Sequence, residues 1–197
     1  MKIKGFTPIS FRDYPGKISS VVFLEGCNLN CKYCFNRDTL VKAKEISQKE
    51  IFSQIENILK KIDGIVITGG EPLINDIRDL RNLIFRLSLF GLPIKLNTNG
   101  FFPAKLAILI TEGLVDFVSM DLKTSPSKLN RFGASSGGSL LVRKSVEILK
   151  ESKIPHMFRT VIDREKYLVD DFDLWWIRDI IGDSPFEVVD EQNSSIL

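Results

Sequence analysis

The stretch ISSVVFLEGCNLNCKYCFN, residues 18–36, joins an apolar run to a loop that contains every cysteine of the chain. Residues 18–25 have the β-branched and aromatic composition of a buried strand. Cys27, Cys31 and Cys34 follow where that strand ends. In α/β proteins ligand sites lie at the carboxyl ends of strands, so this stretch predicts both an α/β fold and the place of its site.

The rest of the chain alternates short apolar runs with longer amphipathic segments. Strands are expected at residues 18–25, 64–69, 93–100, 115–123, 154–163 and 185–190, and helices at residues 47–62, 76–90, 103–113, 139–152 and 170–181. Ser47 and Glu50 suggest a capping box at the first helix, and Ser139 opens the fourth. Such alternation predicts a parallel sheet covered by helices. Periodicity alone allows either a doubly wound open sheet or a partial barrel.

Length and composition are those of a soluble globular protein. The chain has 197 residues, 44% of them hydrophobic and 26% charged, with a net charge of +2. A charge this small does not predict a nucleic-acid partner. The apolar runs are too short to span a membrane or to form a signal peptide, and three clustered cysteines do not suit a disulfide framework. We expect a single domain, residues 1–197, in a reducing cytoplasm.

Unusual residues follow several of the expected strands. GGEP (69–72) follows the second strand, NTNG (97–100) ends the third and DLK (121–123) ends the fourth. Arg159 interrupts the apolar fifth strand and needs an anion, which could be a ligand carboxylate, Asp121 or Glu71. The carboxyl ends of parallel strands meet at one face, so these stretches and the cysteine loop predict a single site.

Three thiols without a fourth cysteine limit the chemistry of the loop. A structural zinc site takes four protein ligands, and the only histidine, His156, lies in the distant fifth strand. Buried structural thiols would have apolar neighbours, whereas these alternate with asparagine and lysine. An iron–sulfur electron carrier would complete its cluster with a fourth cysteine. Three cysteines on a four-iron cluster would leave one iron open, which marks a reactive site.

The pattern C-x3-C-x2-C of Cys27, Cys31 and Cys34 resembles that of the radical S-adenosylmethionine (SAM) enzymes. The resemblance implies a partial (β/α)6 barrel and a [4Fe–4S] cluster held by the three cysteines. SAM would chelate the open iron and be cleaved reductively to a 5′-deoxyadenosyl radical. The cofactors carry this chemistry, and the protein orients them.

The same resemblance implies the residues that hold SAM: Tyr33, Gly69, Gly70, Glu71, Asn97, Asn99, Asp121, Lys123 and Arg159. Tyr33 would contact the adenine, and the GGE segment would contact the methionyl amino group. Asp121 and Lys123 would also be catalytic, since their family counterparts lie near SAM and the incoming substrate. Asn97 stands where an acid is usual, so it would accept a hydrogen bond from the ammonium without charge assistance.

The segment DYPG (13–16), followed by a strand and GCN, resembles the enzymes that activate glycyl radical enzymes, above all the anaerobic ribonucleoside-triphosphate reductase activating proteins. This implies hydrogen abstraction from a glycine of a partner protein under anaerobic conditions. Flavodoxin or ferredoxin would be the electron donor. The chain departs from the family at Phe35, where histidine is usual, and at its closing segment. The alternatives are a radical enzyme for a small molecule or nucleobase, and a degenerate iron–sulfur binding protein.

Overall fold

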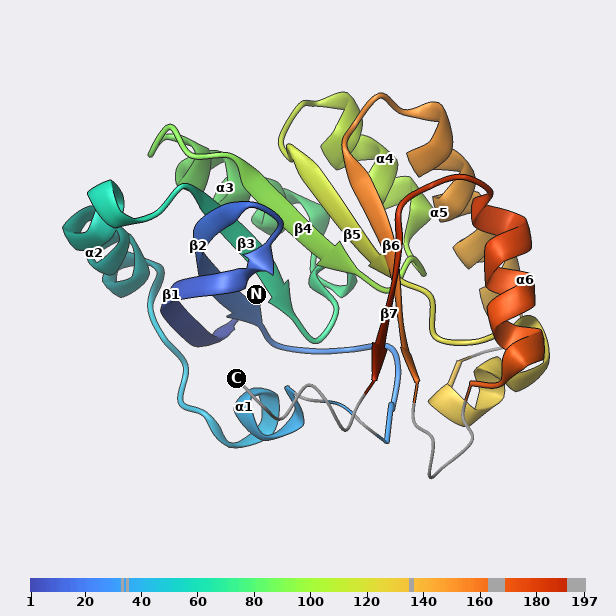
Figure 1. The fold of residues 1–197 in the computed structure, drawn as a ribbon. Coiled ribbons are helices and arrows are strands. Elements are labelled where there is room, and N and C mark those ends of the chain that lie inside the picture. The colour runs from blue at the N-terminus through green and yellow to red at the C-terminus, as the bar shows by residue number, and fades with distance from the viewer. Residues whose placement is uncertain (33, 35, 135–136, 163–168, 191–197) are drawn as a thin grey trace.

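The protein is built around one seven-stranded sheet, shown in the computed structural model of Figure 1, which describes residues 1–32, 34, 36–134, 137–162 and 169–190. The strands lie in chain order: β1 (Ile3–Tyr14), β2 (Lys17–Leu24), β3 (Gly64–Gly69), β4 (Ile94–Thr98), β5 (Phe117–Asp121), β6 (His156–Ile162) and β7 (Phe186–Asp190). β1 is antiparallel to β2, and every other neighbouring pair is parallel. The six predicted strands are therefore confirmed as β2 to β7.

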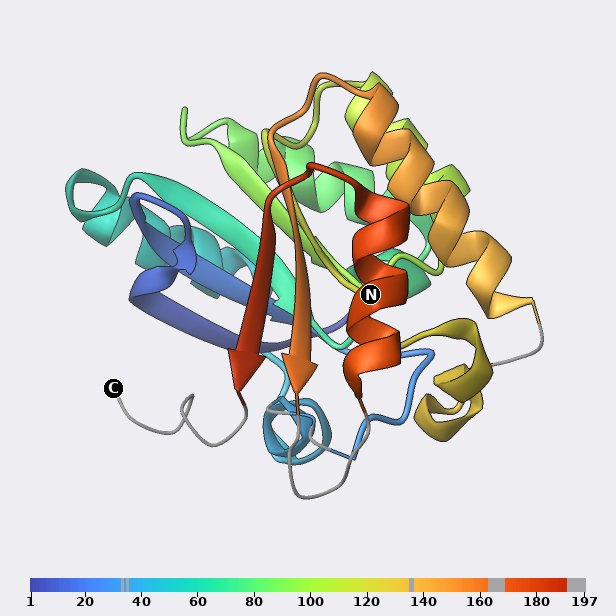
Figure 2. The same ribbon diagram turned by 45° about the vertical axis from the view of Figure 1, so that its right-hand side comes forward.

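Helices connect the parallel strands. They are α1 (Arg37–Lys42), α2 (Gln48–Ile58), α3 (Ile77–Ser88), α4 (Pro103–Thr111), α5 (Gly138–Glu151) and α6 (Asp171–Ile181), with the short 3-10 helices η1 (Leu59–Lys61), η2 (Pro72–Ile74) and η3 (Pro126–Phe132). Each crossover advances one strand in the same direction, and right-handed crossovers then place their helices on one face. Figure 2 shows the later helices along the outer side of the curved sheet.

The strand order decides between the two predicted architectures. A doubly wound sheet reverses its strand order at a switch point, whereas this sheet does not. β1 and β7 are its two edges, and no pairing joins them in the part of the chain that the structure describes. The fold is thus the predicted partial (β/α)6 barrel, preceded by one antiparallel strand. No helix among the described residues is long and apolar enough to cross a bilayer.

Two elements were not predicted from the sequence. β1 contains Pro8 and exposes Ile9 and Phe11, so its residues lack the alternation that marks a half-buried strand. It lies at the edge of the sheet, where proline is tolerated. α1 is a six-residue helix directly after the cysteine loop, too short to show a hydrophobic period.

Helix ends differ from expectation at two places. The Ser47 hydroxyl accepts the Glu50 N–H at 3.2 Å as predicted, but the return bond of a full capping box is not among the hydrogen bonds of the described residues. The first helix also ends earlier than predicted, at Ile58, before η1. α5 is capped by Gly137, with φ at +91°, and not by Ser139, because glycine adopts this left-handed conformation without strain.

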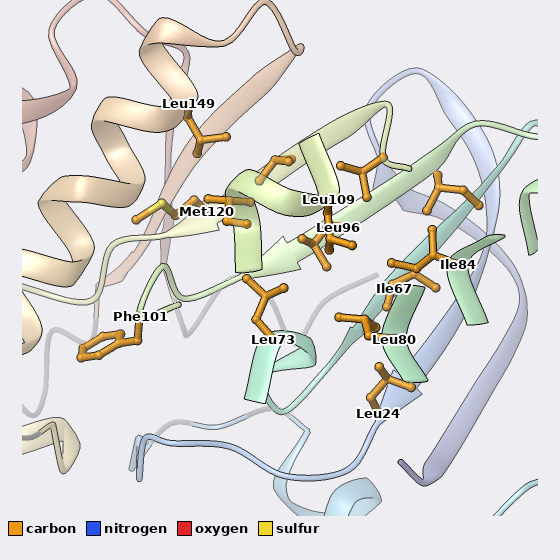
Figure 3. Packing of buried hydrophobic residues seen from close by; sticks show 14 of the residues in the cluster. Leu24, Ile67, Leu73, Leu80, Ile84, Leu96, Phe101, Leu109, Met120 and Leu149 are labelled. Carbon is orange, nitrogen blue, oxygen red and sulfur yellow. The ribbon is translucent and has the colours of Figure 1, made fainter. Parts of the chain in front are cut away.

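Alternate strand residues separate a large outer core from a smaller inner one. On the outer face the fully buried side chains of Leu24, Ile67, Leu96 and Met120 pack beneath the helices (Figure 3). On the inner face, Tyr14, Val21 and Val66 form a second apolar cluster, with Phe23 and Phe117 against it.

The inner face becomes polar toward the carboxyl ends of the strands. Lys95 lies beside Val66 and Phe117, and Asn97 is paired with Ser119 and Asp121 with Arg159. Residues two apart on a strand share a face, so these side chains line the inside of the partial barrel.

Candidate functional site

The cysteine loop lies at the carboxyl end of β2. None of the three thiols is in a disulfide; Cys27 is exposed, and Cys31 and Cys34 are half-buried. Burial raises the pKa of Cys31, and the positive charge of Lys123 opposes that rise. Burial likewise raises the pKa of Cys27, where the nearby Glu71 adds to the effect. The thiols therefore lie within electrostatic reach of two of the other predicted site stretches.

The donor set of this loop suits a cluster better than a single ion. Among the described side chains no group of three or more ligands converges on one metal ion. A [4Fe–4S] cluster bonds its cysteines through separate irons, so its ligands need not converge on one point. His156, the fourth zinc ligand considered above, stands at the amino end of β6, opposite the loop. The loop supplies three free thiols, which is the type and number of ligand that the resemblance implies for such a cluster.

The GGEP segment packs directly onto the cysteine loop. The Gly70 N–H donates to Leu24 O at 3.1 Å, and the Glu71 N–H donates to Gly26 O at 2.8 Å. A Cβ on Gly70 would lie 1.9 Å from Gly26 O, and Gly69 has a φ of +126°. Both glycines are therefore required by the close approach of two loops, in addition to any role in binding a ligand.

The Glu71 side chain joins the GGEP segment to the end of β4. Its carboxylate accepts the Leu73 N–H at 3.0 Å, the Thr98 hydroxyl at 2.8 Å and the Asn99 N–H at 2.6 Å. The residue is fully buried, and burial raises its pKa to about 7 although the three hydrogen bonds oppose this. No surface of the Glu71 side chain is therefore left for a ligand, and its carboxylate joins the two loops.

The two asparagines of NTNG are placed differently. The Asn99 amide donates to Asn28 Oδ1 at 2.8 Å and thus joins β4 to the cysteine loop. Asn97 donates to Thr68 Oγ1 at 3.1 Å, but its Oδ1 is buried and has no hydrogen-bond partner among the described residues. The buried hydroxyl of Ser119, on the neighbouring strand, also lacks one. Buried polar atoms are almost always paired, so these two favour a bound polar ligand.

Asp121 is the anion that Arg159 needs. Arg159 Nε donates to Asp121 Oδ1 at 2.7 Å, and Lys123 Nζ donates to Asp121 Oδ2 at 2.9 Å. Burial alone would raise the pKa of Asp121, but the two cations outweigh it and hold the pKa well below its usual range. The site therefore contains a carboxylate that stays ionised, together with two ordered cations.

The structure thus brings together all predicted site residues that it describes, while Tyr33 and Phe35 lie outside the described residues. Sequence reasoning missed two asparagines of the cysteine loop, Asn28 and Asn36. Asn28 accepts from Asn99, and Asn36 Nδ2 donates to Gly69 O at 2.9 Å. Their position beside the cysteines was the available signal, since side-chain amides next to ligands often fix the loop that carries them.

The sequence is similar to those of known proteins along most of its length. The family model described as Radical SAM superfamily matches residues 21–167. A Methanocaldococcus jannaschii protein, provisionally named as a glycyl-radical enzyme activating enzyme, is 32% identical over 162 residues, which cover 79% of this chain and 65% of that protein. The 7-carboxy-7-deazaguanine synthase of Clostridium acetobutylicum is 32% identical over 135 residues, or 66% of this chain and 58% of the enzyme. The chain spans less than two thirds of either relative.

Solved structures share the fold. Native anSMEcpe with bound AdoMet superposes with a TM-score of 0.60 and 19% identity, covering 84% of this chain and 48% of that one. QueE from Escherichia coli gives a TM-score of 0.56 and 16% identity, covering 98% of this chain and 85% of that one. These matches extend the likeness from the motif to the whole architecture.

Proposed function

Because this chain belongs to the radical SAM superfamily, we propose that Cys27, Cys31 and Cys34 hold the [4Fe–4S] cluster of that family and that the inner barrel face holds SAM. When bound, these cofactors supply the one-electron cleavage of the SAM sulfonium that yields a 5′-deoxyadenosyl radical. The observation that carries the proposal is the hydrogen-bonded junction of the cysteine loop with GGEP and NTNG at the carboxyl ends of β2, β3 and β4.

The chain's own residues have distinct parts in this proposal. The Asn97 Oδ1, which has no described hydrogen-bond partner, would accept a hydrogen bond from the SAM ammonium, and Ser119 would offer its hydroxyl to the same ligand. Asp121 and Lys123, which are hydrogen-bonded to each other, are the proposed catalytic pair and would lie beside SAM and the substrate. Lys123 and Arg159 together keep Asp121 ionised, and the hydrogen bond from Arg159 Nε orients its carboxylate. Glu71 and the two glycines hold the loops at the spacing that the cofactors need.

The proposed substrate is a glycine in the loop of a partner protein, a glycyl radical enzyme such as anaerobic ribonucleotide reductase. Relatives in Methanocaldococcus jannaschii and Haemophilus influenzae carry that provisional name, the second being 36% identical over 99 residues, 48% of this chain and 37% of its own length. The unpaired edges of β1 and β7 leave the described barrel open at its side, which suits entry of a polypeptide loop. A flavodoxin or ferredoxin is the proposed electron donor.

One observation favours a second candidate, a radical reaction on a small molecule. Several relatives are named 7-carboxy-7-deazaguanine synthase, and their identity to this chain is as high as that of the provisional activating enzymes. The activating role takes precedence because the DYPG segment precedes the cysteine loop as it does in the activating enzymes.

The first experiment is anaerobic reconstitution with iron and sulfide, followed by reduction with dithionite and addition of SAM. We expect 5′-deoxyadenosine from the wild type and none from Cys31→Ala, whose iron content and visible absorbance should fall as well. Addition of an anaerobic ribonucleotide reductase should then give the electron paramagnetic resonance doublet of a glycyl radical.

The outcomes separate the two candidates. Cleavage of SAM that is productive only with a small molecule or RNA, and no glycyl radical, would refute the activating role while preserving the radical chemistry. An intact cluster that never cleaves SAM would show a degenerate binding protein. Circular dichroism of Cys31→Ala is the control, because this substitution of a half-buried loop residue should leave the secondary structure unchanged.

A further inference from the structure

An open cavity of about 470 Å³ lies between the outer side of the cysteine loop and η3. We call it the loop cavity; its walls are Asn30, Lys32, Arg37, Asn130, Arg131 and Gly133. Three of these residues are cationic, and none of the lining residues is acidic. A chain whose net charge is only +2 has thus gathered a positive surface beside its ligating cysteines.

The cations of the loop cavity are not neutralised within the described protein. Lys32 and Arg131 are exposed and form no ion pair with any side chain that the structure describes. A second cavity, between α5 and α6, shows the usual alternative: Arg143 and Lys150 there are mixed with Glu147, Glu151 and Asp179. An uncompensated positive cavity favours an anionic partner.

The loop cavity is joined rigidly to the cysteine loop. Arg37 Nη2 donates to the main-chain oxygen of Cys31 at 2.5 Å and to Asn30 Oδ1 at 3.0 Å. The Asn30 N–H donates to Phe132 O at 2.8 Å, which fixes the loop against η3. A protein seated on the cavity would therefore be one residue away from a cysteine that binds the proposed cluster.

We propose that the loop cavity is the docking site of an acidic one-electron carrier protein. This inference rests on the proposed function, because cleavage of SAM consumes one electron that the chain itself cannot supply. The carrier loses one electron, the cluster gains it, and no atom or proton needs to be transferred. Electron-transfer complexes are small and weak, so their association depends on complementary charge more than on buried area.

Binding of oxidised flavodoxin to the reconstituted protein, followed by calorimetry, tests the proposal. Arg131→Glu and Lys32→Glu should each weaken binding about tenfold, because each places like charge against an acidic face. Lys61→Glu is the matched control: it makes the same charge change at an exposed site just before the amino end of β3 and should change binding less than about twofold. Raising the salt concentration from about 0.01 M to about 0.1 M should weaken flavodoxin binding by the wild type. It should also reduce the difference in affinity between the wild type and the two cavity variants.

A second readout separates this inference from the proposed function. With excess dithionite, all variants should cleave SAM as the wild type does, whereas with reduced flavodoxin only Arg131→Glu and Lys32→Glu should be slow. Equal flavodoxin binding by all variants would overturn the docking site. ATP serves as the probe for a small anion in the same cavity. If ATP binding depends on Arg131 while flavodoxin binding does not, the docking site is overturned as well. A wild type that fails with dithionite would refute the proposed function, and the binding comparison would still decide the docking site.

Discussion

Glu71 joins two of the loops that form the candidate site. It is fully buried, faces no cation in a described ion pair, and accepts hydrogen bonds from Leu73, Thr98 and Asn99. Burial raises its pKa to about 7. In the unfolded chain its pKa returns to about 4.3, so the folded state binds more protons between these two values. Ionised Glu71 therefore costs stability as the pH rises through this window.

We predict that Glu71→Gln removes this pH dependence. Relative to the variant, the free energy of unfolding of the wild type should fall by about 3 kcal/mol between about pH 4.5 and about pH 7. Urea unfolding across this range measures the difference. Glu56→Gln, at an exposed site on α2, is the control and should change stability by less than about 0.5 kcal/mol. If the difference in the free energy of unfolding between the wild type and Glu71→Gln stays the same across this pH range, the pKa of Glu71 is not raised.

At the scale of elements, α6 is anchored to the segment that follows β5. Asp173 accepts from Thr124 Oγ1 at 2.9 Å, from the Ser125 N–H at 3.0 Å and from Lys128 Nζ at 2.6 Å. It also completes a capping box with Asp170 at the start of the helix. This segment begins just after Asp121, the last residue of β5, and contains Lys123, so α6 is anchored to the part of the chain that carries the proposed catalytic pair.

We predict that Asp173→Asn destabilises the protein by about 3 kcal/mol at pH 7, since Lys128 loses a buried partner. Burial opposes ionisation of Asp173, but its hydrogen bonds with Lys128 and Ser125 prevail and lower its pKa. Its contribution is therefore present above the unfolded value of about 3.9 and is lost as the pH falls below it. Urea midpoints from pH 7 down to pH 3 test this. Asp179→Asn, exposed on the same helix, should change stability by less than about 0.5 kcal/mol; an equal loss in both variants would contradict the prediction.

At the scale of the whole molecule, one lysine crosses the inside of the barrel. Lys95 of β4 is 3% exposed, and its Nζ donates to the main-chain oxygen of Asp13 in β1. β1 and β4 are not neighbours in the sheet, so this bond ties the antiparallel edge strand to the centre of the fold. Burial, together with the charge of Arg159, lowers the pKa of Lys95 to about 8.

We predict that Lys95→Met alters stability in a pH-dependent way. The unfolded lysine, with a pKa of about 10.4, binds more protons than the folded one above about pH 8. The wild type should therefore gain stability relative to the variant, by about 2 kcal/mol, as the pH rises from about 8 to about 10. Guanidinium unfolding at these two pH values measures the gain. Lys144 is exposed on α5, so the wild type should gain no stability relative to Lys144→Met over this pH range. If the wild type gains none relative to Lys95→Met either, the Lys95 ammonium is not buried in solution.

Much of the fold could be predicted because its signals are local. The apolar run of residues 64–69 and the cap at Ser47 depend on residues that are close in the chain. β1 was missed because its partner, and not its own pattern, makes it a strand. The choice between barrel and open sheet also stayed undecided, since it depends on which strands pair.

The sequence by itself determined the parallel α/β class, the three-cysteine loop and the set of strand ends that carry the site. Only the tertiary structure decided that Arg159 pairs with Asp121 and that buried Glu71 joins two loops by hydrogen bonds. It also decided that Arg131 lines one cavity together with residues of the cysteine loop. The physical reason is that backbone periodicity is fixed by near neighbours. The partner of a buried charge is instead selected among residues far apart in the chain, by the packing that brings them together.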